Sequence, residues 1–594
     1  MSSGERDIFD HCGVGDGDQG LVRVGQEIVG GFSQDRPVGP SSEFATGGIV
    51  SSEVIDSPSH IVGVVVLEQS GDLPSRAQRS AMVASELRRR GFDTILQLPF
   101  VVGVVGTREC YERELGMRFI ESAEGDVGRA DVLGLPASVA GHVVDVCVGG
   151  ELEVFEGGWP DPTWSFITNA LYDDGEPVYA FGPDFGTGGL TNVLFQSDVL
   201  RLLGVDWAHK QNGGGGKLNR GYGVDAYLVD SGIDLSHPLF QGARATAGFE
   251  IDLLPETILF PGVTPGLDLL GHGTMCAAAF LAVAPEAALH VLSCPSSKPN
   301  MVPAWVLNLS VAVAMAVQTK PSVVSTSWGV NLLVNGVPTG PDNVAACKAI
   351  DAAVRFAAEN DVLVVSASGN KGLVTPEGFQ LQYAPVPACL PDVLSVGGAY
   401  PSGLECGLVP DCWTASDYAN SGTALYPSFT GGGQVARPFP DLCSIVNMQA
   451  GNTLLVPWST NSASGIVEPG SGEILKGWRL GGGTSFATPT VAGICSLLMQ
   501  KYLTPGNLPP LLASDGPTTW KSVVLSSDYC VDVREGKTWS MGAAATGQDV
   551  ATGLGVLSAK KLISRVDAKV YDWMIDRASF PLEGVPQERA WPPL

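Results

Sequence analysis

The segment SVVSTSW (322–328) is an apolar run, rich in β-branched residues, that ends in small polar side chains. Similar runs lie on either side of it, separated by segments with apolar residues at helical spacing, 305–318 and 344–359. Strands that are apolar on both faces and alternate with helices predict an α/β fold with a doubly wound, mostly parallel sheet and helices on both faces. The other runs are VDAYLVD (224–230), ALHVLSC (288–294), DVLVVSAS (361–368) and DVLSVGGAY (392–400).

Three residues of reactive type stand where predicted strands end or helices begin. Asp230 closes a strand, His272 lies between two glycines at a helix start, and Ser485 follows three glycines at another helix start. In parallel sheets, ligands bind beyond the carboxyl ends of the strands. A serine becomes a nucleophile beside a base, and a carboxylate orients that base and stabilises its cation. The three segments are YLVDSGIDLSHP (227–238), LGHGTMCAAAF (270–280) and GGGTSFATPTVAGICSLLMQKY (481–502).

The order Asp, His, Ser with these flanking residues resembles the subtilisin-like serine proteases, or subtilases. The resemblance covers about residues 195–565, and Pro489, expected in the first turn of its helix, fits the serine block. It implies a serine endopeptidase that hydrolyses protein or peptide substrates through an acyl-enzyme. It also implies that Asn370, in VVSASGNKG (364–372), donates a hydrogen bond to the oxyanion.

The resemblance also suggests which residues bind substrate. Two short segments, STSWG (325–329) and ASG (367–369), are similar to the substrate-binding strand and to one wall of the first specificity pocket. Cys276, four residues after His272, is similar to a cysteine of the proteinase K-like subgroup, although a buried small apolar residue is the simpler interpretation. The expected substrate-binding residues are Ser327, Trp328, Gly329, Ala367, Ser368 and Gly369.

The remainder of the chain divides into expected regions. Residues 59–122 have the order β-α-β-β-α of a small α+β ferredoxin-like unit. This unit weakly resembles the subtilase propeptide, an intramolecular inhibitor, and a separate interaction domain is an equal alternative. A strand pair is expected around 143–157. The expected regions are a poorly ordered leader (1–58), the ferredoxin-like unit (59–122), a connecting region (123–194), the catalytic domain (195–565) with an insertion within 401–480, and a tail (566–594).

Composition excludes several classes of function. The formal net charge of −27 argues against nucleic-acid binding and against binding to an anionic membrane. We expect no apolar run of the roughly 18 residues that a membrane span needs, and the acidic start does not resemble a secretory signal. A cytoplasmic location is therefore favoured, with non-classical export left open.

The twelve cysteines include no CxxC pair, and reduced thiols are favoured over a disulfide between Cys406 and Cys412. We expect catalysis to need no cofactor. Acidic loops could hold structural calcium, but no calcium-loop pattern identifies ligands, so the metal ligands are unknown.

Two alternatives to a subtilase endopeptidase fit parts of the sequence. The related sedolisin family has glutamate in place of the histidine and aspartate in place of the oxyanion asparagine, so His272 and Asn370 argue against it. A catalytically silent subtilase-fold scaffold that only binds partners is the non-enzyme alternative, and the presence of all four catalytic residue types argues against it.

Overall fold

The structure is a computed structural model that carries side chains. It describes residues 60–121, 127–129, 134–150, 153–154, 172–173, 176–177, 192–194, 196–214, 217–240, 250–253, 266–295, 301–334, 337–370, 385–401, 412–429, 433–447, 452–462, 466–467, 474–501, 519–538 and 542–565. The expected leader 1–58 and tail 566–594 lie outside the described residues, as does Cys406.

A ten-stranded sheet forms the centre of the catalytic region, in the order β14-β15-β13-β16-β20-β22-β26-β34-β31 with β23 paired to β22. Neighbours from β14 to β34 along this order are parallel, whereas β23 and β31 pair antiparallel. The predicted mostly parallel sheet is therefore confirmed. Its strands are β13 (Asp225–Asp230), β14 (Glu250–Leu253), β15 (Ala288–Ser293), β16 (Ser322–Thr326), β20 (Leu363–Ala367), β22 (Leu394–Pro401), β23 (Trp413–Ala415), β26 (Leu442–Ile445), β31 (Cys530–Val531) and β34 (Val556–Leu557).

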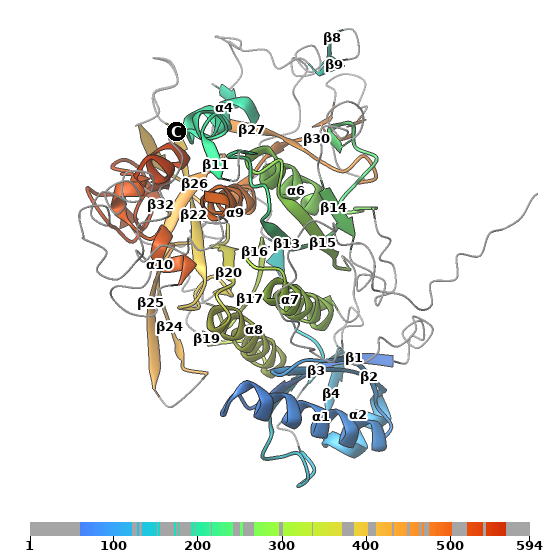
Figure 1. Cartoon of the computed structure of the whole chain (residues 1–594). Coiled ribbons are helices and arrows are strands. Elements are labelled where there is room, and N and C mark those ends of the chain that lie inside the picture. Colours follow the sequence, from blue (N-terminus) through green and yellow to red (C-terminus); the bar gives the residue numbers. More distant parts are fainter. Residues whose placement is uncertain are drawn as a thin grey trace, which may run out of the picture. The chain divides into compact units, whose positions relative to one another are not determined.

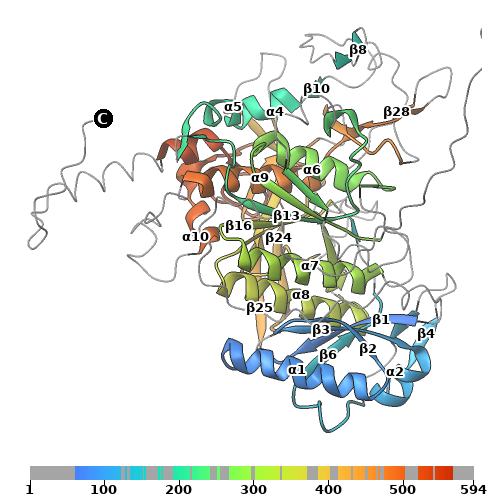
Figure 2. The ribbon, with the colours of Figure 1, turned by 45° about the vertical axis from the view of Figure 1, so that its right-hand side comes forward.

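Helices cover both faces of this sheet (Figures 1 and 2). On one face lie α6 (His272–Val283) and α9 (Gly483–Lys501), and on the other lie α7 (Met301–Gln318) and α8 (Pro341–Glu359). Strand β13 shows why its sequence is apolar throughout, because alternate side chains point to opposite faces. Ala226 and Leu228 join the core with α6 and α9, whereas Tyr227 and Val229 join the core with α7 and α8.

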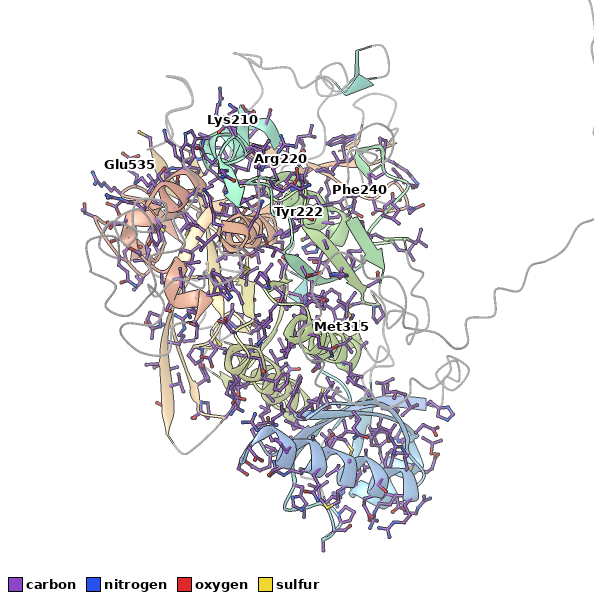
Figure 3. The ribbon with its side chains drawn as sticks, in the orientation of Figure 1. Lys210, Arg220, Tyr222, Phe240, Met315 and Glu535 are labelled. Carbon is purple, nitrogen blue, oxygen red and sulfur yellow. The ribbon has the colours of Figure 1, made fainter. Side chains whose placement is uncertain are left out.

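Helix α7 differs from the sequence-based expectations in its start and in its apolar length. It begins at Met301 rather than at residue 305, and its 18 residues are long and apolar enough to cross a membrane by length and composition. Most of the helix (72%) is buried inside the protein. Met315, on its outer side, is only partly buried at the margin of the core (Figure 3). A helix packed between a sheet and other elements needs this composition without any membrane.

The N-terminal region contains a four-stranded antiparallel sheet in the order β2-β3-β1-β6. Alternate residues of β1 serve its two faces. Val62 and Val64 pack in the core with α7 and α8, whereas Ile61 and Val65 pack with the two helices of this region. The blue sheet therefore lies directly against α7 and α8 (Figures 1 and 2). The elements are β1 (His60–Leu67), α1 (Leu73–Arg89), β2 (Asp93–Gln97), β3 (Val101–Thr107), α2 (Arg108–Leu115) and β6 (Val143–Cys147).

Two expectations about this half of the chain differ from the structure. The sheet takes its fourth strand, β6, from beyond the expected 59–122 unit. The strand pair expected around 143–157 was wrong, because β6 pairs with β1, whereas β7 (Glu153–Val154) pairs with β17 (Trp328–Asn331). Strand partners were misassigned because sequence spacing suggests local hairpins and cannot reveal a pairing between segments as distant as Val154 and Trp328.

The expected insertion 401–480 also contributes to the central architecture. It supplies β26 to the sheet, an extended hairpin of β24 (Gly422–Pro427) and β25 (Gln434–Phe439), and the strands β27 (Asn452–Pro457) and β30 (Trp478–Gly481) that lead to Ser485. Every cysteine of the described residues is a free thiol, Cys412 included.

Candidate active site

Asp230 and His272 meet at the carboxyl edge of the central sheet. Strand β13 ends at Asp230, and His272 is the first residue of α6. Asp230 Oδ1 accepts a hydrogen bond from His272 Nδ1 at 2.8 Å, and both side chains are fully buried. Gly271 precedes the histidine with φ +97°, a left-handed conformation that favours glycine, and a Cβ there would strike the Trp458 ring.

Ser485 lies in the first turn of α9, on the helix that packs against α6. Its Oγ donates to the carbonyl of Ser327 at 3.3 Å. His272 Nε2 has no hydrogen-bond partner among the described residues, and the Nδ1 bond to Asp230 leaves Nε2 as the nitrogen able to act as a base. The serine, imidazole and carboxylate predicted from the sequence therefore lie on adjoining elements of one edge.

The carbonyl of Ser485 has an unusual set of partners. Helix α9 begins at Gly483, so Pro489 lies in its second turn and not in the first as expected. Proline has no N–H, which removes the helical bond that the carbonyl four residues earlier would accept. Ser327 Oγ at 3.1 Å and Cys276 Sγ at 3.4 Å donate to that carbonyl instead. Cys276 thus connects α6 to the backbone of the proposed nucleophile, a contact that the sequence argument missed.

Asn370 lies just beyond the end of β20 and is buried. Its Oδ1 accepts from the Thr484 N–H at 3.0 Å and from Thr484 Oγ1 at 2.9 Å. These two bonds orient the amide so that its oxygen faces the residue before Ser485 and its Nδ2 donor faces away from Thr484.

The expected substrate-binding residues border this edge from two strands. Ser327 lies between β16 and β17, and Gly329 is the second residue of β17. The Trp328 side chain is buried in the core, where its Nε1 donates to Val229 O at 3.0 Å. Trp328 can therefore meet a substrate only through its backbone. Ala367 ends β20, followed by Ser368 and by Gly369, whose carbonyl accepts from Asn420 N at 2.8 Å.

Burial and charge oppose each other at His272. Burial lowers its pKa, but the carboxylate of Asp230 and the hydrogen bond to it outweigh burial and hold the pKa well above its ordinary value. Burial, with the nearby charge of Asp230, raises the pKa of Cys276 to about 11, so this thiol is protonated at neutral pH. Asp230, His272 and Cys276 offer ligand atoms within 4.8 Å of one another, a spacing that could also hold a metal ion.

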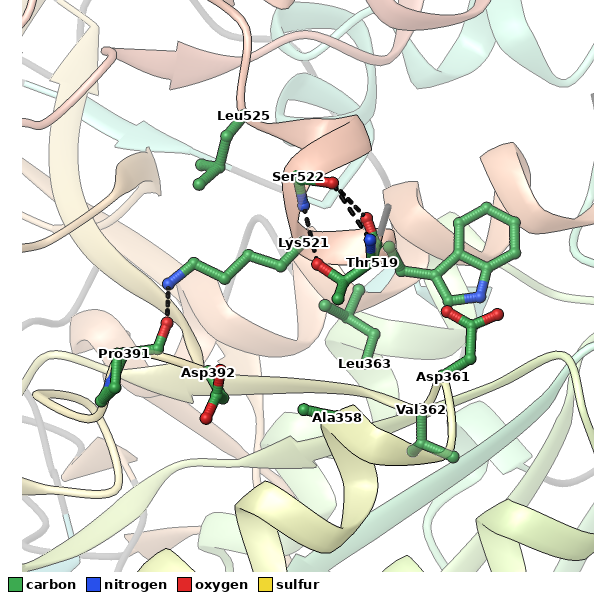
Figure 4. A pocket seen from close by; sticks show the side chains of 11 residues that line it. Ala358, Asp361, Val362, Leu363, Pro391, Asp392, Thr519, Lys521, Ser522 and Leu525 are labelled. Atoms are coloured by element: carbon green, nitrogen blue, oxygen red, sulfur yellow. Dashed lines mark hydrogen bonds between the residues drawn. The ribbon is translucent and has the colours of Figure 1, made fainter. Parts of the chain in front are cut away.

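A separate cavity of about 160 Å³ lies at the opposite, amino edge of the sheet (Figure 4). It is lined at the starts of β20 and β22 and by the short helix α10 (Trp520–Val524). Lys521 donates there to Pro391 O at 2.6 Å and to Val393 O at 2.7 Å. The cavity lining contains none of the residues predicted to be functional.

Comparison with known proteins gives the class. A model of the subtilase family, Peptidase S8, matches residues 223–524, just over half of the chain. The chain therefore belongs to the subtilase family, whose members are serine proteases.

Two curated relatives are similar over part of the chain. An intracellular serine protease of Paenibacillus polymyxa is 29% identical over 189 residues, which cover 30% of this chain and 50% of the relative. The subtilisin-like protease PopC of Myxococcus xanthus (strain DK1622) is 28% identical over 260 residues, covering 42% and 49%. The chain spans about half the length of these relatives. The crystal structure of fervidolysin from Fervidobacterium pennivorans, a keratinolytic enzyme related to subtilisin, aligns with a TM-score of 0.47 and 14% identity over 85% of this chain and 61% of that one.

Proposed function

We propose that this protein is a serine endopeptidase that hydrolyses protein or peptide substrates with Ser485 as nucleophile, His272 as general base and Asp230 as the carboxylate that orients it. The observation that carries the proposal is the buried 2.8 Å bond between Asp230 and His272 Nδ1, next to the helix whose first turn contains Ser485. The bond assigns Nδ1 as the donor and leaves Nε2 to take a proton.

In the proposed reaction, His272 Nε2 takes the proton of Ser485 Oγ as the oxygen attacks the scissile carbonyl. The Ser485 N–H and Asn370 Nδ2 donate to the resulting oxyanion. His272 then gives the proton to the departing amine as the peptide C–N bond breaks. Water then attacks the acyl-enzyme, again with His272 as the base, which releases the new carboxylic acid and restores the Ser485 hydroxyl. No cofactor takes part in this scheme, and calcium could have only a structural role.

Substrate would bind by adding a strand to β17, since an extended peptide pairs with the backbone of an exposed strand edge. Ser327, Trp328 and Gly329 would supply backbone groups to that pairing. The segment of Ala367, Ser368 and Gly369 would form the facing wall, with Asn420 restricting its far end through the bond to Gly369 O. Within the subtilase family, we propose on the basis of Cys276 that the chain is related to the proteinase K-like subgroup.

We also propose that the N-terminal sheet is a ferredoxin-like, propeptide-like inhibitor. Glu153 and Val154 of β7 pair antiparallel with Gly329 and Trp328, the edge that substrate would need. The same N-terminal sheet packs on α7 and α8. Because β7 runs antiparallel to β17, its chain direction leads toward Ser327, whose carbonyl accepts from Ser485 Oγ. We therefore expect self-cleavage downstream of Val154.

The inhibitor proposal has an internal control. In an antiparallel pair, neighbouring residues alternate in whether their N–H faces the partner strand. Of Glu153→Pro and Val154→Pro, one therefore removes a bond to β17 and the other does not. In the full chain, the variant that loses a bond to β17 should hydrolyse a short peptide faster than wild type. The other variant should show a smaller increase in rate. Equal rates in all three proteins would contradict inhibition by β7.

Labelling by a fluorophosphonate tests the catalytic proposal directly. The wild-type protein should form a covalent adduct, and Ser485→Ala should not. A catalytically silent scaffold, the alternative that family membership does not favour, would show no labelling and no hydrolysis in any form of the chain.

A further inference from the structure

Asp268 is a buried carboxylate between the segments that carry Asp230 and His272, and the sequence argument did not single it out. Its Oδ1 accepts from Ser231 Oγ at 2.9 Å and from Gly271 N at 2.8 Å. Its Oδ2 accepts from Thr274 N at 2.9 Å and from Thr274 Oγ1 at 2.7 Å. Four donors from two segments converge on one side chain.

These bonds connect both sides of the Asp230–His272 pair. Ser231 follows Asp230, and its N–H donates to Asp230 Oδ1 at 2.7 Å. The Ser231 hydroxyl also accepts from Gly273 N at 2.9 Å, so it links the residue after His272 to Asp268. Asp268 thus holds the loop of the carboxylate and the loop of the imidazole at the same time.

Asp268 also supplies the cap that α6 lacks. The residue before the helix is Gly271, which has no side chain to accept the first N–H groups. The carboxylate of Asp268 accepts two of these groups from outside the helix, and a negative charge at a helix N-terminus is favourable. These bonds to Asp268 hold the start of α6 in position, and His272 is the first residue of that helix.

We propose that Asp268 is a positioning residue that holds the imidazole of His272 at bonding distance from Asp230; its catalytic consequence rests on the proposed function. An amide cannot replace this carboxylate. Each oxygen faces one backbone N–H, which can only donate, so the NH₂ group of Asp268→Asn must oppose either Gly271 N or Thr274 N. Asp268→Asn therefore disturbs the start of α6 whichever way the amide turns.

Asp234 provides a matched control. It is equally buried, and each of its oxygens likewise accepts from a backbone N–H and from a hydroxyl. Oδ1 accepts from Ser236 N and Oγ, and Oδ2 accepts from Thr460 N, from Thr460 Oγ1 and, at 3.3 Å, from Ser459 Oγ. Its side chain attaches the 459–460 segment and makes no bond to the residues flanking His272. Asp234→Asn should cost stability in the same way without moving the imidazole.

The kinetic test compares the two variants at matched active-site concentration. Asp268→Asn should lower kcat by about 10²-fold with little change in KM, because a small displacement of a catalytic group is that costly. Asp234→Asn should keep the wild-type kcat. Ser231→Ala removes the two hydrogen bonds of the Ser231 hydroxyl but leaves Gly271 and Thr274 bound to Asp268, so it should lower kcat by a smaller factor, about five- to tenfold. An unchanged kcat in Ser231→Ala and in folded Asp268→Asn, or equal losses in the two aspartate variants, would overturn the proposal.

A second readout does not depend on hydrolysis. The chain has 7 histidines, so NMR with labelled histidine can follow the titration of His272. Loosening the bond to Asp230 should lower the His272 pKa in Asp268→Asn and in Ser231→Ala, but not in Asp234→Asn. If His272 titrates at the wild-type pH in all three, Asp268 is merely structural. If the pKa shifts but the wild-type protein neither hydrolyses peptides nor reacts with a fluorophosphonate, the positioning role holds and the proposed function fails.

Discussion

The two edges of the central sheet carry polar groups with different surroundings. At the carboxyl edge, Asp230, His272 and Ser485 are fully buried, and helix starts and strand ends surround them. At the amino edge, the cavity of Figure 4 has exposed Asp392 and partly exposed Asp361 on its lining. Lys521 there donates to backbone carbonyls and pairs with Asp441 at 3.3 Å.

The difference lies in how backbone groups are oriented at each edge. At the carboxyl edge, helices begin, so unpaired N–H groups converge where a negative charge can develop. At the amino edge, the carbonyls of Pro391 and Val393, just before β22 begins, accept from the cation of Lys521. We therefore expect substitutions at the carboxyl edge to change kcat and substitutions at the amino edge to change only stability.

The largest expected effect is that of Ser485→Ala. Hydrolysis of an unstructured protein substrate should fall on the order of 10⁶-fold in kcat, the loss that follows removal of the nucleophile in subtilisin. The substitution removes one buried hydroxyl, so the melting temperature should change little. Steady-state hydrolysis and thermal unfolding of both proteins give the answer. Activity within tenfold of wild type would remove Ser485 from the mechanism.

Substitutions of Asn370 test whether a residue of the carboxyl edge acts in catalysis or only in stability. Asn370→Ala should lower kcat by about 10²–10³-fold with little effect on KM, because its donor acts on charge that develops in the transition state. Asn370→Asp keeps the oxygen that accepts from Thr484 and replaces only the donor, so it should be at least as damaging yet more stable than Asn370→Ala. If Asn370 is only structural, Asn370→Asp should be nearly as active as wild type in kcat measurements.

The pKa of His272 predicts opposite pH dependences for activity and stability. Activity needs the neutral ring, so kcat/KM should fall as pH drops through a pKa above the ordinary value of about 6.5. Because folding raises this pKa, the contribution of the charged pair to stability is complete below about pH 6.5 and is lost as pH rises through the folded-state pKa. Asp230→Asn removes the charge that raises the His272 pKa, so the fall in kcat/KM should occur at lower pH in this variant. A pH–rate profile with an optimum near pH 4 would contradict the assignment of His272 as base.

The smallest expected effect is at the amino edge. Lys521→Met leaves two carbonyl acceptors and part of the Asp441 carboxylate without their donor, which should cost about 1–3 kcal/mol of unfolding free energy. The kcat of the folded variant should equal that of wild type. Denaturant unfolding and active-site titration check the two parts separately. A large fall in kcat without a change in stability would show that the two edges are not independent.

Local pattern predicted much of the architecture. The apolar runs 224–230 and 361–368 became β13 and β20, and the helical spacing before 359 became α8, since continuous burial on both faces requires apolar residues throughout. The glycine-flanked His272 was likewise recognised at a helix start, because a glycine there permits the positive φ. The starts of α7 and α8 were placed late, at 305 and 344 instead of Met301 and Pro341, because each first turn contains a proline, which in the sequence marks a boundary.

The sequence by itself determined the central strands of the main sheet and the helices beside them, the family, and the residue types that meet at one edge, because each of these is encoded in short-range patterns and in motifs. Only the tertiary structure decided which distant segments pair. It placed β7 on β17, β26 in the central sheet, and Ser327 and Cys276 on the carbonyl that Pro489 leaves without an N–H. It also brought Asp268 between the two loops of the Asp230–His272 pair. Such contacts escape sequence analysis because a hydrogen bond depends on the position of two groups in space, and a lone aspartate or cysteine carries no periodicity that reveals its partner.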